Sequence, residues 1–391
     1  MSGRILEILK IIDENEVVQI SEKLIRIPSP TGGEEAISRL ICSYAQSIGF
    51  TLVQRSDQWD VVARIDGEQR GPRLLFLTHL DHSRPTDEQE PYDPKILDGK
   101  DFGKPGKVVV GRGSCSPKGT IASMLCAGRV LAGRKEELKG SLIIAAVGRD
   151  LLANHDGIRE VAERGWIDAD MAIAGEPTGN QPIISARGIN HIEITVQGIS
   201  SHWGRPEEGI NPIWSLPQVL EVLQQLIKEL PSHKFLKKAT LVPIDIRCDM
   251  SPPRTPTACH LILDRRTLPG EHSDFILKIM QERFDQLELK NQKICANIKN
   301  QMYPFEGNPM SLISQKVSEM HELITGQRVP FGYLTFATNG SFLTSQMKIP
   351  TVVYGPGRIE DMAPREHVEV DRLIMAAKVY AGTALEVLQG N

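Results

Sequence analysis

The feature that most constrains the fold of this chain is a change of secondary-structure pattern in its middle. Up to residue 185, apolar runs of strand length alternate with segments in which apolar residues recur every three or four positions. This alternation predicts an α/β domain with helices on both faces of its sheet. The same pattern resumes after Gly307, so we expect residues 1–185 and 307–391 to form one α/β domain.

Residues 186–306 follow a different order. The predicted elements are a strand at 192–196, a helix at 214–230, strands at 239–246 and 259–263, a helix at 273–287 and a strand near 295–298. Strand, helix, strand, strand, helix, strand is the ferredoxin-like split βαβ pattern. We therefore expect an inserted α+β domain that interrupts the first domain.

The composition narrows the class of protein. The 391 residues include 45 basic and 49 acidic side chains without a basic run, so nothing favours a nucleic-acid partner. No stretch approaches the ~18 apolar residues of a membrane-spanning helix, and the N-terminal segment lacks a signal-peptide pattern. We therefore expect no membrane association. Because the six cysteines are scattered without a CxxC pair, we expect all of them to be reduced thiols of a cytoplasmic protein. They are Cys42, Cys115, Cys126, Cys248, Cys259 and Cys295.

Polar residues follow several predicted strands of the α/β domain. His79 and Asp81 come directly after the strand at 74–77. Asp150 follows the apolar run at 142–147, and Glu176 follows the run at 171–174. Because ligands of open α/β sheets bind at the carboxyl ends of the strands, we expect these side chains to line one crevice.

Six motifs add up to a family resemblance. They are THLD at 78–81, GRGSCSPKG at 111–119, GEPTG at 175–179, SSHWGRPEEGINPI at 200–213, LTFATNG at 334–340 and YGPG at 354–357. With these motifs the chain resembles, over nearly its whole length, the di-zinc peptidase family of acetylornithine deacetylase, succinyl-diaminopimelate desuccinylase and the aminoacylases. The resemblance implies a zinc-binding α/β domain with a mixed sheet, interrupted by a ferredoxin-like lid through which such proteins often dimerise. It therefore implies a homodimer and hydrolase-type chemistry at C–N bonds.

The resemblance assigns one zinc position. His79 stands where the family has a zinc-binding His, and Asp81 stands where an Asp orients that His. Glu176 occupies the place of a Glu that binds the same zinc. The family's bridging Asp is replaced by Ser116. Because Pro117 follows at a place where the family carries a cis peptide, we predict that the Ser116–Pro117 bond is cis.

At the second zinc position, the resemblance implies that more of the family's ligands are replaced. Leu151 and Met362 stand where the family has a Glu and a His, and Asp150 stands where it has its general base. Leucine does not bind zinc, and a thioether prefers copper(I). Catalytic zinc normally has three protein ligands and a water. We therefore expect no cofactor, or at most one weakly bound divalent metal (zinc) on His79 and Glu176.

Other residues near the strand ends could repair a single-metal site. The candidates are His82, Cys115, His155 and Asp156. Cys115 is a poor replacement for its neighbour Ser116, because adjacent side chains of an extended backbone point in opposite directions. The simpler interpretation takes His155 as a surface histidine of a loop and His79 as a histidine that is hydrogen-bonded to Asp81.

The resemblance also places residues that face the substrate. His202 matches a lid His that polarises the scissile carbonyl in the active site of the partner subunit. Arg266 matches a lid Arg that can bind a substrate carboxylate, while a strand-end ion pair is an equally open interpretation. Asn339 and Gly340 fall where the family contacts its ligand.

These expectations lead to three functions. The first is an amide-bond-processing enzyme that acts on an amino-acid-derived substrate through an altered, metal-poor centre. Its reaction would be hydrolysis or a metal-free cyclisation or condensation, with Asp81, Asp150 and His202 as catalytic residues. The alternative is a non-catalytic ligand-binding protein or partner subunit. The third is an ordinary zinc-dependent deacylase, which rests on the resemblance alone.

Overall fold

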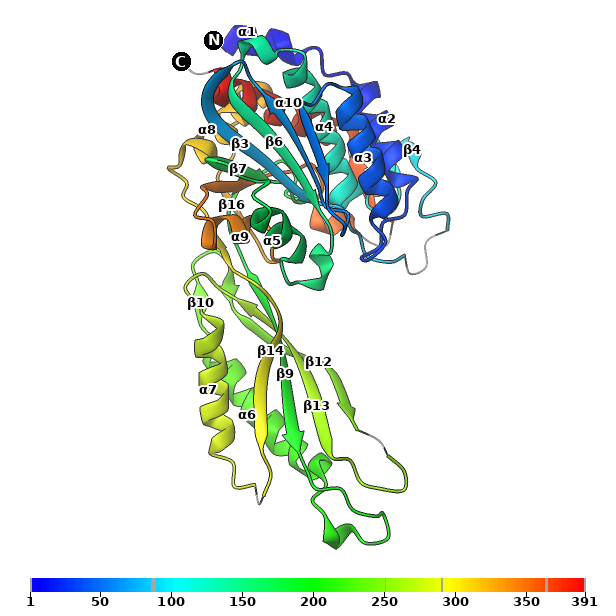
Figure 1. Ribbon diagram of the computed structural model, residues 1–391, viewed down its shortest axis with the longest axis vertical. Helices are drawn as coiled ribbons and strands as arrows, with labels where there is room; N and C mark the ends of the chain where they lie inside the picture. The colour runs from blue at the N-terminus through cyan, green and yellow to red at the C-terminus, as the bar shows by residue number, and fades with distance from the viewer. Residues whose placement is uncertain (1, 86–88, 250, 290, 363–364, 390–391) are drawn as a thin grey trace. The chain divides into compact units, whose positions relative to one another are not determined.

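The computed structural model describes residues 2–85, 89–249, 251–289, 291–362 and 365–389. The chain forms two compact units (Figure 1). Unit 1 comprises Met1–Ser185, Phe305–Leu334 and Thr338–Asn391, and unit 2 comprises Ala186–Pro304 and Thr335–Ala337. The mixed α/β architecture with an inserted α+β unit confirms the predicted fold class.

Unit 1 is built on a mixed sheet. Its strands are β1 (Leu52–Arg55), β2 (Val61–Asp66), β3 (Gln69–His79), β6 (Lys139–Val147), β7 (Met171–Ala174), β8 (Ile183–Ala186), β15 (Phe305–Glu306), β16 (Gly332–Leu334) and β17 (Thr351–Val353). Their order is β1-β2-β6-β3-β7-β17-β8-β15, and β16 pairs with β8. The central strands β6, β3, β7 and β17 are parallel, whereas β2 and β8 run antiparallel to their neighbours in this order. β7 and β17 and the C-terminal parts of β3 and β6 are buried and largely apolar, as expected of strands covered on both faces.

The helices of unit 1 cover this sheet. They are α1 (Ser2–Leu9), α2 (Glu14–Ile25), α3 (Glu35–Ser47), α4 (Gly119–Ala132), α5 (Asp156–Glu163), α8 (Leu312–Thr325), α9 (Gly340–Ser345) and α10 (Val370–Gln389). In α4, small and apolar residues allow close packing against α10, and nearly all of α4 is buried. Both helices belong to the main hydrophobic core of the unit. A smaller sheet in the order β18-β5-β4 pairs His367–Glu369, Lys107–Val110 and Lys95–Asp98.

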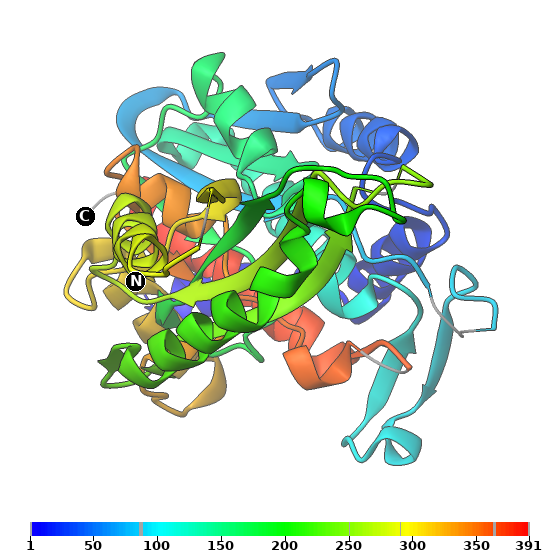
Figure 2. The same cartoon turned by 90° about the horizontal axis from the view of Figure 1, so that it is seen from below.

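Unit 2 has the ferredoxin-like order. Its main elements are β9 (Gly188–Gln197), α6 (Leu216–Glu229), β12 (Thr240–Cys248), β13 (Ala258–Thr267), α7 (Ser273–Asp285) and β14 (Ile294–Met302), with a short hairpin of β10 (Ser232–His233) and β11 (Lys237–Lys238). The four long strands form an antiparallel sheet in the order β12-β13-β9-β14. The helices α6 and α7 share one apolar core with this sheet (Figure 2). The sheet leaves β12 as an edge strand.

The cysteines correct one expectation. Cys248 and Cys259 form a disulfide, so the prediction that all six cysteines are reduced is wrong for this pair. The two residues lie directly opposite each other in the register of β12 and β13, which brings their side chains together. The other four cysteines are free, with Cys115 and Cys126 buried. In the sequence the two cysteines are simply 11 residues apart, and this spacing does not reveal the strand register that brings them together.

No described helix combines the length and the apolar character that crossing a bilayer requires.

Candidate functional site

The centre of the candidate site lies at the carboxyl ends of three neighbouring parallel strands in unit 1. The register places His79, the last residue of β3, beside Val147 at the end of β6. On the other side of β3, Leu77 pairs with Ala174, the last residue of β7. Asp150 follows β6 and Glu176 follows β7, so the topology brings both carboxylates to the same edge as His79.

His79 lies at the centre of this group of side chains. Its Nε2 atom lies 3.1 Å from the hydroxyl oxygen of Ser116, and its Nδ1 atom lies 3.5 Å from a carboxylate oxygen of Asp81. The side chain is 5% exposed. Burial alone would lower the pKa of His79, but the negative charges of Asp150, Asp81 and Glu176 outweigh it and raise the pKa to about 10. His79 is therefore an imidazolium held among carboxylates.

Asp81 links the strand end to the loop that carries Asp150. Its carboxylate accepts hydrogen bonds from the backbone N–H groups of Asp150 and Leu151, both at 3.1 Å, and from the Thr31 hydroxyl at 2.8 Å. Burial opposes ionisation, yet the neighbouring His79 and these hydrogen bonds lower the pKa of Asp81. Asp81 stays ionised, which suits a residue that orients His79.

Asp150 and Glu176 both have raised pKa values. Burial raises the pKa of Asp150 to about 6, against the opposing charge of His79. Burial, together with the charge of Asp150, raises the pKa of Glu176 to about 8, although His79 and a hydrogen bond to Thr338 favour its ionised form. Two carboxyl groups with pKa values on either side of 7 can exchange protons at neutral pH.

Two acidic residues that the sequence did not single out hold the loop of Asp150. Asp60 accepts a hydrogen bond from the Gly148 N–H at 2.8 Å and pairs with the Arg149 guanidinium at 3.0 Å. Glu34 accepts from the Arg149 N–H at 3.0 Å. Arg149 has a positive φ of 61°, so these contacts fix a turn that a non-glycine residue adopts rarely. Asp60 directly precedes β2 and Glu34 directly precedes α3, and an acidic residue at such a position is too common to single out from sequence.

Glu366 plays the same part for the loop that carries Ser116. Its carboxylate accepts hydrogen bonds from the backbone N–H groups of Gly113 (2.8 Å), Cys115 (3.1 Å) and Ser116 (3.2 Å). The Arg112 Nη1 atom lies 3.3 Å from the same carboxylate and forms an ion pair with it. The Ser116–Pro117 bond is cis, as predicted. Nothing in the sequence indicates these contacts, because they join residues about 250 positions apart.

The residues that the resemblance places at the two zinc positions include few metal-binding side chains. The described part of the chain has no group of three or more His, Cys, Asp or Glu side chains arranged to hold a metal ion. Ser116 supplies a neutral hydroxyl beside His79, and Leu151 has a side chain without donor atoms that is 46% exposed. Met362 is half-buried and offers a thioether. His79 and Glu176 alone fall short of the usual three protein ligands.

The residues considered for repair of the site have other partners. His155 is buried, so its interpretation as a surface histidine is wrong: its Nδ1 lies 2.9 Å from the Asn339 side-chain oxygen and its Nε2 3.3 Å from the Ser341 hydroxyl. The Nε2 of His82 accepts from the Ser29 N–H at 3.0 Å, while its Nδ1 donates to the Ser83 carbonyl at 2.8 Å. Sequence spacing showed the loop around 155 but not that it folds inward.

Cys115, the remaining candidate near Ser116, is also buried. Its thiol donates to the Arg358 carbonyl at 3.0 Å, and burial raises its pKa well above the usual thiol value. It is therefore a neutral thiol and not a thiolate ligand.

The two predicted lid residues lie in unit 2. His202 is exposed, and its Nδ1 accepts a hydrogen bond from the Gly204 N–H at 3.1 Å. Arg266 forms two hydrogen bonds with Asp264, at 2.8 and 3.0 Å. Asp264 also lies 3.4 Å from His191. One edge of the Arg266 guanidinium, formed by Nε and Nη2, is therefore already engaged by a carboxylate of its own strand.

Comparison with known proteins shows which proteins this chain is similar to. Residues 184–292 match the M20 peptidase dimerisation domain. The chain is 26% identical over 402 residues to the uncharacterized protein YgeY of Escherichia coli, which covers 95% of this chain and 94% of the relative. It is 24% identical over 425 residues to the N-formyl-4-amino-5-aminomethyl-2-methylpyrimidine deformylase of Halalkalibacterium halodurans, with 95% of each chain covered.

Among solved structures, the chain is similar to the YXEP protein of Bacillus subtilis, described as a dinuclear metal binding peptidase from the M20 family. The TM-score is 0.71 at 15% identity, with 96% of this chain and 98% of that chain covered. The fold is thus shared from end to end. This chain carries the M20 peptidase dimerisation domain within the fold of the M20 peptidase family.

Proposed function

We propose that this chain processes an amide bond of an amino-acid-derived substrate through proton-transferring side chains in place of a dinuclear metal centre. The observation that carries the proposal is the 3.1 Å contact between His79 Nε2 and the Ser116 hydroxyl. A hydroxyl takes the place of the carboxylate that would bridge two metals, and it engages the histidine nitrogen that would bind one. The similarity to M20 hydrolases supports the class of reaction.

The carboxyl groups supply the chemistry in this proposal. Asp150 acts as the general base and Glu176 as a proton donor, because their pKa values of about 6 and 8 lie on either side of neutrality. Asp81 fixes His79 and keeps it cationic, which stabilises negative charge that develops on a carbonyl oxygen nearby. The reaction is hydrolysis or a metal-free cyclisation or condensation.

The substrate-facing residues complete the proposal. His202 polarises the reacting carbonyl of a partner subunit, and Arg266 binds a substrate carboxylate once Asp264 releases part of its guanidinium. Asn339 and Gly340 contact the ligand through the buried start of α9. His202 is exposed and therefore available to a neighbouring subunit.

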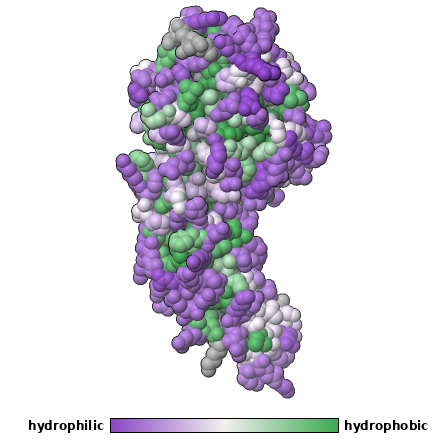
Figure 3. Space-filling view, turned by 60° about the vertical axis from the view of Figure 1, so that its left-hand side comes forward, coloured by the Kyte–Doolittle hydropathy of each residue, from purple (hydrophilic) through white to green (hydrophobic). Residues whose placement is uncertain are grey.

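We propose that two copies of the chain form a homodimer through unit 2. The edge strand β12 exposes Val242 (49%), Ile244 (54%) and Ile246 (52%), and an exposed apolar edge is a site for pairing with another chain. The surface of unit 2 seen in Figure 3 also carries apolar patches between hydrophilic residues. The match to a dimerisation domain supports pairing of two copies. We propose that the protein works in the cytoplasm, without nucleic-acid or membrane partners.

A second candidate is a non-catalytic ligand-binding protein or partner subunit. Two contacts favour this second candidate: the hydrogen bond between Asn339 and His155, and the pairing of Arg266 with Asp264. In each of them the protein itself holds in place a side chain, Asn339 or Arg266, that would face the ligand. An ordinary zinc-dependent deacylase is the third candidate. Similarity to a dinuclear metal binding peptidase favours it, while the donor set of Ser116, Leu151 and Met362 opposes it.

An activity assay separates the three. Turnover of a panel of N-acyl amino acids is measured with added zinc and with chelator, for the wild type, Asp150→Asn and the control Asp57→Asn. The Asp57 side chain is 97% exposed, so Asp57→Asn removes the same negative charge from a position outside the site. The proposal predicts turnover that zinc does not stimulate and that falls by about 10² or more in Asp150→Asn only.

Zinc-stimulated turnover would contradict the proposal and favour the deacylase. Absence of turnover, with ligand affinity retained in Asp150→Asn, would favour the binding protein.

A further inference from the structure

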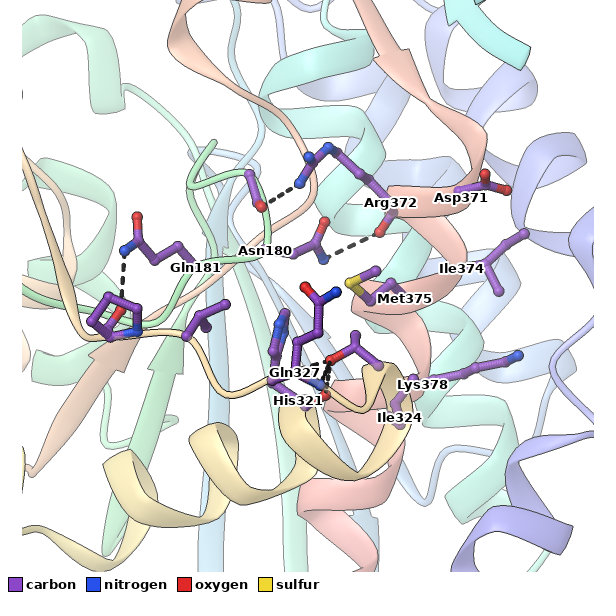
Figure 4. A pocket seen from close by; sticks show the side chains of 14 residues that line it. Asn180, Gln181, His321, Ile324, Gln327, Asp371, Arg372, Ile374, Met375 and Lys378 are labelled. Carbon is purple, nitrogen blue, oxygen red and sulfur yellow. Dashed lines mark hydrogen bonds between the residues drawn. The ribbon is translucent and has the colours of Figure 1, made fainter. Parts of the chain in front are cut away.

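Two features of the chain lie outside the group around His79 and take no part in the proposed reaction. The first is a cavity of about 670 Å³ in unit 1, between the turn at 179–181, the end of α8 and the first half of α10 (Figure 4). Arg372 on its wall is already engaged by Glu369 and by the Gly179 carbonyl, so this wall specifies no ligand. The second feature is the disulfide of unit 2, which lies beside a segment that carries a candidate site residue.

The disulfide joins two strand ends at the base of one loop. Cys248 is the last residue of β12 and Cys259 is the second residue of β13, and they lie opposite each other in the strand register. The loop between the two strands includes residues 251–257. The disulfide therefore closes the base of this loop with a covalent bond.

The loop at 251–257 holds the segment that carries His202. The Ser201 N–H donates to the Thr255 hydroxyl oxygen at 2.9 Å, and the Ser201 carbonyl accepts from the Thr255 N–H at 2.8 Å. The Ser200 hydroxyl donates to the Thr255 carbonyl at 2.7 Å. These hydrogen bonds attach the chain just before His202 to the loop.

Arg254 attaches the same segment through its side chain and its backbone. Its Nε donates to the Ser200 hydroxyl oxygen at 3.2 Å, and its Nη2 donates to the Ser200 carbonyl at 3.1 Å. Its backbone forms a β-bridge with His202. The Trp203 N–H donates to the Pro253 carbonyl at 2.9 Å. The chain on both sides of His202 is thus bonded to the loop that the disulfide closes.

The fold selects these two cysteines as partners. Cys259 is fully buried in the apolar core of unit 2, and Cys248 is half-buried against the same core. Cys295, the other cysteine of unit 2, follows Ile294 of that core, and side chains alternate along a strand. Cys295 therefore faces the opposite side of the sheet and cannot replace either partner. A small thiol from solution reaches the disulfide at Cys248, the more exposed of the two.

We propose that Cys248 and Cys259 form a redox modification site that controls the position of His202. The thiolate of a low-molecular-weight monothiol attacks the Cys248 sulfur, and the Cys259 sulfur leaves and takes up a proton. A second small thiolate attacks the mixed disulfide at the sulfur of the first, and Cys248 leaves and is protonated. The protein disulfide gains two electrons and becomes two thiols, while the two small thiols lose these electrons and become one disulfide.

Reduction frees the base of the loop. β12 is an edge strand that pairs only with β13, so the loss of the covalent bond gives the loop at 251–257 more conformational freedom. Among the described residues, the hydrogen bonds that 200–203 make beyond their own turn all go to 253–255. The segment of His202 therefore loses order together with the loop. Only the consequence for turnover rests on the proposed role of His202 in the reaction.

Hydrogen exchange of the full chain, read by mass spectrometry of its fragments, tests this control. The chain is oxidised with oxidised glutathione or reduced with dithiothreitol before exchange. Cys248→Ala lacks the disulfide under both conditions, and Cys295→Ser is the matched control that loses a free thiol of the same unit. Exchange in α4 reports whether unit 1 stays folded.

Reduction of the wild type should speed exchange in the fragments that contain 200–203 and 251–257 by at least about tenfold, without a change in α4. Cys248→Ala should exchange at the reduced rate under both conditions, and Cys295→Ser should behave as the wild type does. Equal exchange of these fragments in the oxidised and reduced chain would overturn the proposal. Failure of oxidised glutathione to join Cys248 to Cys259 would overturn it as well. Neither result depends on turnover, so the proposed reaction and this inference can fail separately.

Discussion

At the scale of single residues, the buried histidines show that the surroundings of a side chain inside the protein determine its pKa. His82 and His155 both have pKa values lowered to about 4, chiefly by burial. His79 is also buried, yet its pKa rises to about 10 because three carboxylates surround it. The sequence names the same residue type at all three positions. Which of them is charged follows only from the partners that the fold supplies.

His155 gives a stability prediction with a definite sign. Its pKa is about 4 in the folded state against the ordinary 6.5, so the unfolded chain binds more protons between these values. Its contribution to stability is therefore complete above pH 6.5 and is lost as the pH falls toward 4, by up to about 3 kcal/mol. His155→Gln removes this titration. Urea unfolding from pH 7 to pH 4 should show that the wild-type advantage over the variant shrinks on acidification.

An advantage of the wild type that stays constant over this pH range would show that His155 is not held neutral by burial.

At the scale of elements, the loops that carry the site are held by carboxylates from elsewhere in the chain. Glu366 holds the segment of Ser116, and Asp60 holds the turn before Asp150. Strand ends place the site residues roughly, and these contacts then fix the loops. Their partners are distant in sequence, which is why pattern analysis did not find them.

Glu366→Gln tests the first of these contacts. Glutamine has one acceptor oxygen where glutamate has two, and it lacks the charge that attracts Arg112 and three backbone N–H groups. We expect a loss of about 1–3 kcal/mol in the free energy of unfolding, measured with urea. Glu360→Gln, at an exposed position nearby, should change stability by less than about 0.5 kcal/mol. Equal effects of the two variants would contradict a holding role for Glu366.

The disulfide between β12 and β13 gives a second prediction at this scale. Alkylation of the unfolded chain without reductant should label four of the six cysteines and leave Cys248 and Cys259 protected. Closure of a loop with a separation of 11 residues contributes about 3 kcal/mol, so reductant should lower the unfolding free energy of unit 2 by that order. Labelling of all six cysteines would show that the pair is reduced, as a reducing compartment favours.

At the scale of the whole molecule, alternating and ferredoxin-like patterns predicted the fold class well. The periodicity of 214–230 and 273–287 corresponds to α6 and α7, because each helix buries one face against its sheet. The first helix, Ser2–Leu9, was not predicted, since its short apolar pattern has no capping signal. The order of the strands in unit 2 and the disulfide between β12 and β13 depend on which strands pair and in which register. The linear pattern of the sequence does not contain this information.

The candidate site was predictable only in part. Strand ends identified His79, Asp81, Asp150 and Glu176, because the topology of parallel strands determines which ends meet. The contact of His155 with Asn339 was not predictable, since it depends on how a loop packs, whereas the pairing of Arg266 with Asp264 is the strand-end ion pair that the sequence offered as one interpretation. The proposal of a metal-poor centre rests on residue types alone, because no packing turns leucine into a zinc ligand.

The central claim is that this crevice holds too few ligands for a dinuclear centre. Its most direct test is the zinc content of the purified chain after incubation with excess zinc and exhaustive dialysis, measured by inductively coupled plasma mass spectrometry. With His79 and Glu176 as the available protein ligands, the account predicts no more than one equivalent per chain, weakly held. Two equivalents retained per chain would contradict it.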